Sequence, residues 1–212
     1  LMEGIADTPE KQLRYFRAIK QRTGNLIRLV DSLSEYSRLE NGFHYQMEEA
    51  DLRIFVEQYL EACKDELQNH HVEIELQCGR ESFPVQIDRE EFKRVFDNLF
   101  SNTVKYRTEE QSNVLIALKR TEQGADIELI FQDDGPGVPK ESLEHIFDSF
   151  YRVDDSRNQS KEGSGIGLAV VKEIICGHGG HISADNRNGL AIIIHLPAVR
   201  EDIDGKNTDR GR

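Results

Sequence analysis

The longest regular pattern in the sequence lies near its start. Over residues 8–39, apolar side chains recur mainly in steps of three, four and seven: Leu13, Phe16, Ile19, Leu26, Leu29, Val30, Leu33 and Tyr36. This spacing places them on one face of a single long helix. Asp7 or Thr8 can cap the start of that helix, Pro9 suits its first turn, and Asn41-Gly42 suits its end. The apolar face must be covered, either by the core of the same chain or by another copy in a helical bundle.

Beyond residue 43 the apolar pattern becomes shorter and more varied. Helical periodicity predicts helices over 51–68, 88–106 and 168–176, with Asp88 as the cap of the second, and a short helix near 142–147. A short strand is expected over 44–50, and alternating apolar residues predict further strands at 72–76, 83–87, 114–118, 127–131, 182–184 and 191–195. Because helices are mixed with mostly hairpin-connected strands, the pattern predicts an α+β fold rather than a doubly wound sheet.

Composition narrows the class of protein. The 212 residues suffice for one or two domains, and the net charge of −12 argues against nucleic acid as a partner, because its phosphates would be repelled. A phosphate ligand would therefore need backbone amides, local cations or a metal. Three cysteines form no CxxC pair, so reduced thiols are expected. No apolar run approaches the ~20 residues that span a membrane.

A first polar cluster lies on the helix predicted over 88–106. Asn98, Asn102 and Lys105 are spaced by four and three residues, so they share one helical face. An amide oxygen can bind Mg²⁺, which relies on water and substrate phosphate for its other ligands, and a lysine one turn away offers a charge to the same phosphates. The alternative is an ordinary amphipathic helix with a polar face.

Two glycine-rich clusters follow. The first is Asp133-Asp134-Gly135-Pro136-Gly137, at the end of a predicted strand, where a carboxylate could accept a hydrogen bond from an exocyclic amine such as that of adenine. The second, 163–168, has the sequence GSGIGL and precedes a predicted helix, so its amides could face a phosphate. Taken singly, the first could be a plain turn and the second a flexible linker.

The ordered set of clusters resembles the catalytic and ATP-binding domain of sensor histidine kinases, within the Bergerat-fold ATPase superfamily. The polar helix is similar to the asparagine box of that family, and the two glycine clusters to its first and second glycine boxes. Between them, 146–152 (IFDSFYR) resembles the phenylalanine box, and 37–42 (SRLENG) resembles the end of the second helix of the dimerisation hairpin. The resemblance covers residues 8–197, nearly the whole chain.

The resemblance implies a fold and a division of the chain. The fold is a two-layer sandwich of a mixed β-sheet and helices, preceded by one long helix. Residues 1–42 would be the remnant of the dimerisation and phosphotransfer hairpin, 43–198 the catalytic ATP-binding domain, and 199–212 a disordered tail, since the tail is charged and without apolar periodicity.

The resemblance also implies site residues for ATP and Mg²⁺. Asn102 corresponds to the metal-binding asparagine, and Asp133 to the residue that holds the adenine amine. The other expected nucleotide-binding residues are Asn98, Lys105, Tyr106, Gly135, Gly137, Arg152, Gly163, Gly165, Gly167 and Leu168. Residues 138–162 would form the ATP lid. One departure from the family is a third glycine box shortened to Asn188-Gly189.

The phosphate-accepting histidine of the family is the missing element. Seven histidines occur, none is followed by Asp or Glu, and none lies on the 8–39 helix. Structural or surface roles are therefore expected for all seven, and a metal site at His70-His71 is disfavoured because adjacent side chains diverge. The chain starts at Leu1, so we expect a kinase fragment that binds Mg²⁺-ATP, transfers phosphate only within a longer protein, and does not phosphorylate itself.

The family further implies partners and a location. These are the receiver domain of a response regulator, a second copy of the kinase, and a cytoplasmic position for this fragment of a protein anchored in the bacterial inner membrane. Three alternatives stay open. They are a non-kinase Bergerat ATPase such as a chaperone or mismatch-repair module, a serine-kinase anti-sigma factor, and a degenerate module that binds partners but no nucleotide.

Overall fold

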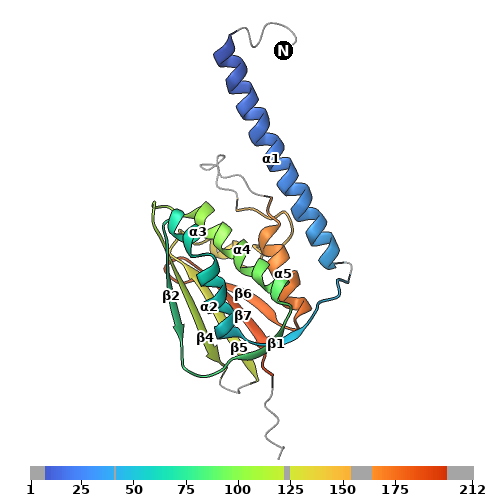
Figure 1. The fold of residues 1–212 in the computed structure, drawn as a ribbon, viewed down its shortest axis with the longest axis vertical. Coiled ribbons are helices and arrows are strands. Elements are labelled where there is room, and N and C mark those ends of the chain that lie inside the picture. The colour runs from blue at the N-terminus through green and yellow to red at the C-terminus, as the bar shows by residue number, and fades with distance from the viewer. Residues whose placement is uncertain (1–7, 41, 122–124, 154–163, 200–212) are drawn as a thin grey trace, which may run out of the picture.

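The computed structural model describes residues 8–40, 42–121, 125–153 and 164–199. One long helix, α1 (Pro9–Glu40), projects from a sandwich of a sheet and helices, as Figure 1 shows. The Thr8 hydroxyl accepts a hydrogen bond from the Lys11 backbone N–H at 3.3 Å, so Thr8, one of the two predicted candidates, caps α1.

The main sheet has five strands in the order β2-β4-β5-β7-β6. Their bounds are β2 (Val72–Cys78), β4 (Ser112–Arg120), β5 (Asp126–Asp133), β6 (His181–Asn186) and β7 (Leu190–Pro197). The pair β2–β4 is parallel and the other three pairs are antiparallel. The predicted mixed sheet is therefore confirmed. A separate two-stranded sheet pairs β1 (Glu48–Asp51) with β3 (Pro84–Ile87).

Four helices cover one face of the main sheet (Figure 1). They are α2 (Leu52–Ala62), α3 (Lys64–Asn69), α4 (Arg89–Tyr106) and α5 (Gly167–Gly177). The Asp51 and Asp88 side chains cap α2 and α4 by accepting backbone N–H groups of the first turn. The apolar face of α4, with Phe92, Val95 and Phe96, is fully buried. This packing fixes α4 against the sheet and leaves its other face for the polar residues.

Three local predictions are corrected by the structure. The helix predicted over 51–68 is interrupted at Cys63, which ends α2 and precedes α3. The helix predicted near 142–147 is wrong, because a short 3-10 helix, η1 (Lys140–Ser142), is followed by turns. The strand expected over 44–50 begins only at Glu48. The predicted disordered tail lies outside the described residues, apart from Val199.

The apolar stripe of α1 is not covered by the other residues that the structure describes. Leu13, Phe16, Ile19, Leu26, Leu29, Val30 and Leu33 are all exposed, whereas Leu39, near the end of the helix, is buried. The prediction that the core of the same chain covers this stripe is therefore wrong, except at the last turns of α1. Among the described helices, none combines the length and apolar character needed to cross a membrane.

Candidate functional site

The polar face of α4 meets the start of α5. Asn98 donates its side-chain N–H to the Arg94 carbonyl at 2.8 Å, which fixes its amide group. A Cβ added to Gly167 would lie 2.9 Å from the Asn98 Oδ1, so a larger residue at Gly167 would displace the Asn98 amide. The first and third predicted clusters are thus in contact, and the amides that begin α5 lie beside the asparagine face.

The other predicted residues of α4 lie in its last two turns. Asn102 is partly exposed, and its side chain makes no hydrogen bond to any residue of the described ranges. The Lys105 ammonium donates to the Tyr106 hydroxyl at 2.9 Å and lies 4.5 Å from the centroid of the Tyr106 ring. Tyr106 is 41% exposed. This end of α4 therefore presents an amide, a cation and an aromatic ring.

Asp133 ends β5, and its carboxylate is held by two backbone hydrogen bonds. Its Oδ1 accepts two backbone hydrogen bonds, from Gly135 at 2.9 Å and from Leu190 at 3.2 Å. The Oδ2 atom has no hydrogen-bond partner among the described residues. Burial raises the pKa of Asp133 above its ordinary value, and the two backbone hydrogen bonds oppose part of that rise. One oxygen is thus fixed while the other can accept from a ligand.

The first glycine cluster lies close to the end of α4. A Cβ added to Gly135 would lie 3.9 Å from the Tyr106 carbonyl oxygen. The carboxylate of Asp133 and the last turn of α4 therefore border the same region. Together with the contact between Asn98 and Gly167, this arrangement places the three clusters along one helix, from its middle to its end.

The turn between β6 and β7 forms another wall of this region. Gly189 has a φ of +143°, and a Cβ added to it would lie 1.9 Å from the Asp133 carbonyl oxygen. Only glycine permits this approach of two backbones. Leu190, which donates to Asp133, follows directly. The shortened third glycine box therefore contributes backbone to the site despite its length.

The segment after η1 is folded onto the second glycine cluster. Phe150, with a φ of +67°, donates its backbone N–H to the Gly165 carbonyl at 2.9 Å. Gly165 has a φ of +71°, and a Cβ there would lie 2.9 Å from the Tyr151 carbonyl oxygen. Arg152 is exposed at the edge of the described chain. Gly163 and the part of the predicted lid at 154–162 lie outside the described residues, whereas 138–153 are described.

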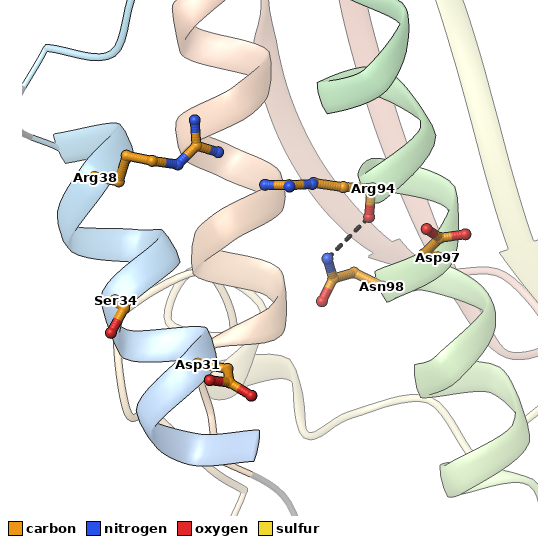
Figure 2. Close-up of a pocket in the computed structure, with 6 residues that line it drawn as sticks. All are labelled: Asp31, Ser34, Arg38, Arg94, Asp97 and Asn98. Atoms are coloured by element: carbon orange, nitrogen blue, oxygen red, sulfur yellow. Dashed lines mark hydrogen bonds between the residues drawn. The ribbon is translucent and has the colours of Figure 1, made fainter. Parts of the chain in front are cut away.

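A cleft of about 540 Å³ separates α1 from α4 (Figure 2). It is lined by Asp31, Ser34 and Arg38 of α1 and by Arg94, Asp97 and Asn98 of α4. Two of the lining residues also bind the Glu91 carboxylate, Arg38 at 2.8 Å and Arg94 at 3.3 Å. The cleft therefore lies between the long helix α1 and the face of α4 that carries Asn98.

Two contributors to the site were missed in the sequence. Arg94 lies one turn before Asn98 on α4. In the sequence, an arginine at this position looks like an ordinary surface residue. Asn186, at the end of β6, binds the backbone of Val138 from 48 positions away in the chain, which no local pattern could indicate. Among the described residues, no group of three or more His, Cys, Asp or Glu side chains could hold a metal ion.

Three of the histidines make contacts within the fold. His178 is buried, donates from Nδ1 to the Ile174 carbonyl at 2.7 Å and accepts the Asp88 backbone N–H on Nε2 at 2.9 Å. Both ring nitrogens are therefore occupied. His181 and His195 stack on neighbouring strands, with ring centroids 4.3 Å apart. None of the seven histidines lies on α1.

Comparisons with known proteins agree with this geometry. A family model described as histidine kinase-, DNA gyrase B-, and HSP90-like ATPase matches residues 87–200. The sensor histidine kinase WalK of Bacillus subtilis (strain 168) is 31% identical over 207 residues, which cover 96% of this chain and 34% of WalK. The chain thus spans about a third of that relative.

Two solved structures show the same fold. Full-length ShkA in complex with AMPPNP has a TM-score of 0.71 at 21% identity, covering 92% of this chain and 40% of ShkA. The histidine kinase ThkA in complex with the response regulator protein TrrA has a TM-score of 0.70 at 23% identity, covering 91% of this chain and 53% of that chain. The predicted two-layer α+β fold is confirmed by these likenesses.

Proposed function

Because the chain belongs to the histidine kinase-, DNA gyrase B-, and HSP90-like ATPase family, we propose that its residues 43–198 bind Mg²⁺-ATP. Within a longer sensor kinase, this ATP would phosphorylate a histidine, and the phosphoryl group would pass to an aspartate of a response regulator. The observation that carries the proposal is the carboxylate of Asp133, fixed on one oxygen by Gly135 and Leu190 and available on the other.

Asp133 would select the base. The exocyclic amine of adenine is a hydrogen-bond donor, and the carboxylate Oδ2 is an acceptor without a partner among the described residues. Guanine carries a carbonyl oxygen at the same ring position, so it would place two acceptors against each other. A buried carboxylate facing an acceptor is costly, and we therefore expect adenine nucleotides to bind in preference to guanine nucleotides.

The phosphates would lie along the polar face of α4. The absence of a side chain at Gly167 lets the first amides of α5 come close to Asn98, which suits an anion held at a helix start. Lys105 and Arg152 would add positive charge. Asn102, whose amide is free of hydrogen bonds to described residues, would be the protein ligand of Mg²⁺. When bound, Mg²⁺ neutralises phosphate charge.

The acceptor of the phosphoryl group would lie on another part of the longer protein. None of the histidines is on α1, and the buried His178 uses both ring nitrogens in hydrogen bonds. We therefore propose that residues 1–42 are the remnant of a hairpin whose other helix carries the acceptor. This chain alone would bind ATP without labelling itself.

The open side of α1 supports the proposed protein partners. Its apolar stripe, with Phe16, Ile19 and Leu26 each more than half exposed, suits burial against a second copy in a helical bundle. Its exposed cations, Lys11, Arg14, Arg17, Lys20 and Arg22, would favour an acidic partner surface. The complex of ThkA with the response regulator TrrA supports a receiver domain as that partner.

The base site is tested by a pair of neighbouring carboxylates. Asp133→Asn places an amide N–H₂ group against the adenine amine, so two donors would meet. We expect binding of AMPPNP with Mg²⁺ to weaken by about 1–3 kcal/mol, or roughly 5- to 150-fold in Kd. Asp134→Asn is the control, because Asp134 is exposed and its side chain forms a hydrogen bond only with the Asn113 side chain among the described residues.

Isothermal titration calorimetry would measure both variants, and circular dichroism would check that each is folded. Equal affinities of the wild type, Asp133→Asn and Asp134→Asn would remove Asp133 from the site. Tight GMPPNP binding by the wild type would contradict the assignment of the base.

A further inference from the structure

The turn between β6 and β7 and the first glycine cluster are connected by one side chain, that of Asn186. Asn186 is the last residue of β6, and its side chain reaches Val138, just beyond Gly137. Its Nδ2 donates to the Val138 carbonyl at 2.7 Å, and its Oδ1 accepts the Val138 N–H at 3.1 Å. One amide thus satisfies both backbone groups of one residue, in the manner of a neighbouring β-strand.

The absence of a side chain at Gly137 leaves space for the Asn186 amide. The φ of Gly137 is +67°, and a Cβ added to it would lie only 2.5 Å from the Asn186 Oδ1. The glycine therefore serves two needs at this position, a left-handed backbone and space for the asparagine. A plain turn would need only the first of these, so the contact indicates a specific anchor for the loop.

The β6–β7 turn is itself attached to β5, so the anchor rests on a fixed support. The Gln132 side chain donates to the Arg187 carbonyl, and Arg187 donates its backbone N–H to Gly189 at 2.9 Å. Gly189 lies against the backbone of Asp133. The shortened turn therefore holds Asp133 through the backbone on one side and holds the Gly137–Val138 loop through Asn186 on the other.

We propose that Asn186 is a positioning residue for nucleotide binding, which keeps the Gly137–Val138 edge of the base site in its binding conformation. This inference rests on the proposed function, since it concerns the same site. Asp133 sets which base is accepted, whereas Asn186 sets how much of the free protein has the loop ready. When only a fraction of molecules has a competent loop, the apparent affinity falls by that fraction.

The test compares Asn186→Ala with Asn188→Gly in the 212-residue chain. Asn188 lies in the same turn with a φ of +56°, a conformation that glycine adopts readily, and it takes no part in the contact with Val138. We expect Asn186→Ala to weaken AMPPNP binding with Mg²⁺ by about tenfold, which equals about 1.4 kcal/mol. We expect Asn188→Gly to bind within twofold of the wild type.

Hydrogen exchange of the Val138 amide gives a second readout. In the nucleotide-free protein this amide should exchange faster in Asn186→Ala than in the wild type, because its acceptor is gone, and saturating AMPPNP should restore part of the protection. A residue that served only stability would lower the unfolding midpoint without changing the affinity of the folded protein. If Asn186→Ala fails to fold, Asn186→Ser, which keeps a single hydrogen-bonding group, takes its place with a smaller expected loss.

The outcomes separate this inference from the proposed function. If the wild type binds AMPPNP and Asn186→Ala binds equally well, the positioning role is wrong while ATP binding stands. If Asn188→Gly weakens binding as much as Asn186→Ala, any change in the β6–β7 turn lowers the affinity, and the positioning role of Asn186 is wrong. If the wild type binds no nucleotide, the proposed function fails first, and the exchange measurement alone still decides whether Asn186 holds the loop.

Discussion

Replacing Gly189 by alanine would test whether the β6–β7 turn shapes the site through backbone contact. The added Cβ would lie 1.9 Å from the Asp133 carbonyl oxygen, whereas real Cβ contacts are essentially never shorter than 3.0 Å. The turn or β5 would therefore have to move by roughly 1 Å. The φ of +143° adds strain, because L-residues with a side chain rarely adopt it.

The expected loss of free energy has two parts, the strain of the backbone and the loss of a hydrogen bond. Strained backbone costs about 1–3 kcal/mol, and losing the Leu190 hydrogen bond to Asp133 costs about 0.5–1.5 kcal/mol. We expect a total of about 2–4 kcal/mol, shared between a lower free energy of unfolding and a weaker affinity for AMPPNP. Because Leu190 holds the Oδ1 of Asp133, a freed carboxylate should lower the affinity at least tenfold.

Urea unfolding and calorimetric titration would measure the two parts separately. Gly79→Ala is the matched control, since a Cβ there would meet Glu81 at 3.5 Å, an ordinary contact. The control should stay within about 1 kcal/mol of the wild type. The reasoning would be refuted if Gly189→Ala matched the control in both stability and AMPPNP affinity.

Two further predictions concern the junction between α1 and the sandwich. Burial lowers the pKa of His178 below its ordinary value of 6.5, with opposing contributions from the Ile174 carbonyl, Asp88 and Glu91. The unfolded chain then takes up the proton first as pH falls, so the stability from neutral His178 is full above about pH 6.5 and declines below it, by at most about 1.4 kcal/mol per pH unit. Urea unfolding at pH 7.5 and pH 5.5 should show a smaller loss in His178→Gln than in the wild type; equal losses would contradict the assignment. Arg38→Ala should leave Glu91 with Arg94 alone and loosen the end of α1, at a cost of about 1 kcal/mol, discounted because Arg38 is partly exposed. Hydrogen exchange at Leu39 should then rise, whereas Lys20→Ala should leave it unchanged; unaltered exchange in Arg38→Ala would show that the ion pair does not hold the helix.

Elements with a strong periodic pattern were predicted well from the sequence. The α1 stripe and the α4 face are long enough for their period to be unambiguous, and Asp88 marks the start of α4 as expected. The alternating pattern predicts the strands because the apolar face of each lies in the core or packs against it. Local sequence suffices where a single face of a long element decides the structure.

Errors arose where the structure depends on contacts distant in sequence. The apolar spacing of Leu143, Ile146 and Phe147 resembles a helical turn. The segment is instead fixed by two hydrogen bonds, from the Tyr151 hydroxyl to the Ser142 hydroxyl and from the Phe150 backbone N–H to the Gly165 carbonyl. The break at Cys63 has no glycine or proline to mark it. The parallel pairing of β2 with β4 also has no local signal, because it depends on how α4 crosses between the two strands.

The residue types of the candidate site could be predicted from the sequence, but the groups that hold these side chains in place could not. Asp133, Asn98 and the glycines stand out through their order along the chain. Which atoms hold them could not be predicted, because the supports are backbone groups such as the Leu190 N–H and the Arg94 carbonyl. Any residue type can supply a backbone group, so neither of these two supports has a sequence signature.

The most direct test of the central claim follows nucleotide and covalent label in one sample. The purified chain is incubated with ATP labelled on its γ-phosphate, with and without Mg²⁺, and bound nucleotide and acid-labile label on the protein are both measured. The account predicts saturable, Mg²⁺-dependent binding without label on the protein, because no described histidine lies on α1 and His178 is fully hydrogen-bonded. Absence of binding at millimolar nucleotide, or stable acid-labile label on this chain alone, would contradict it.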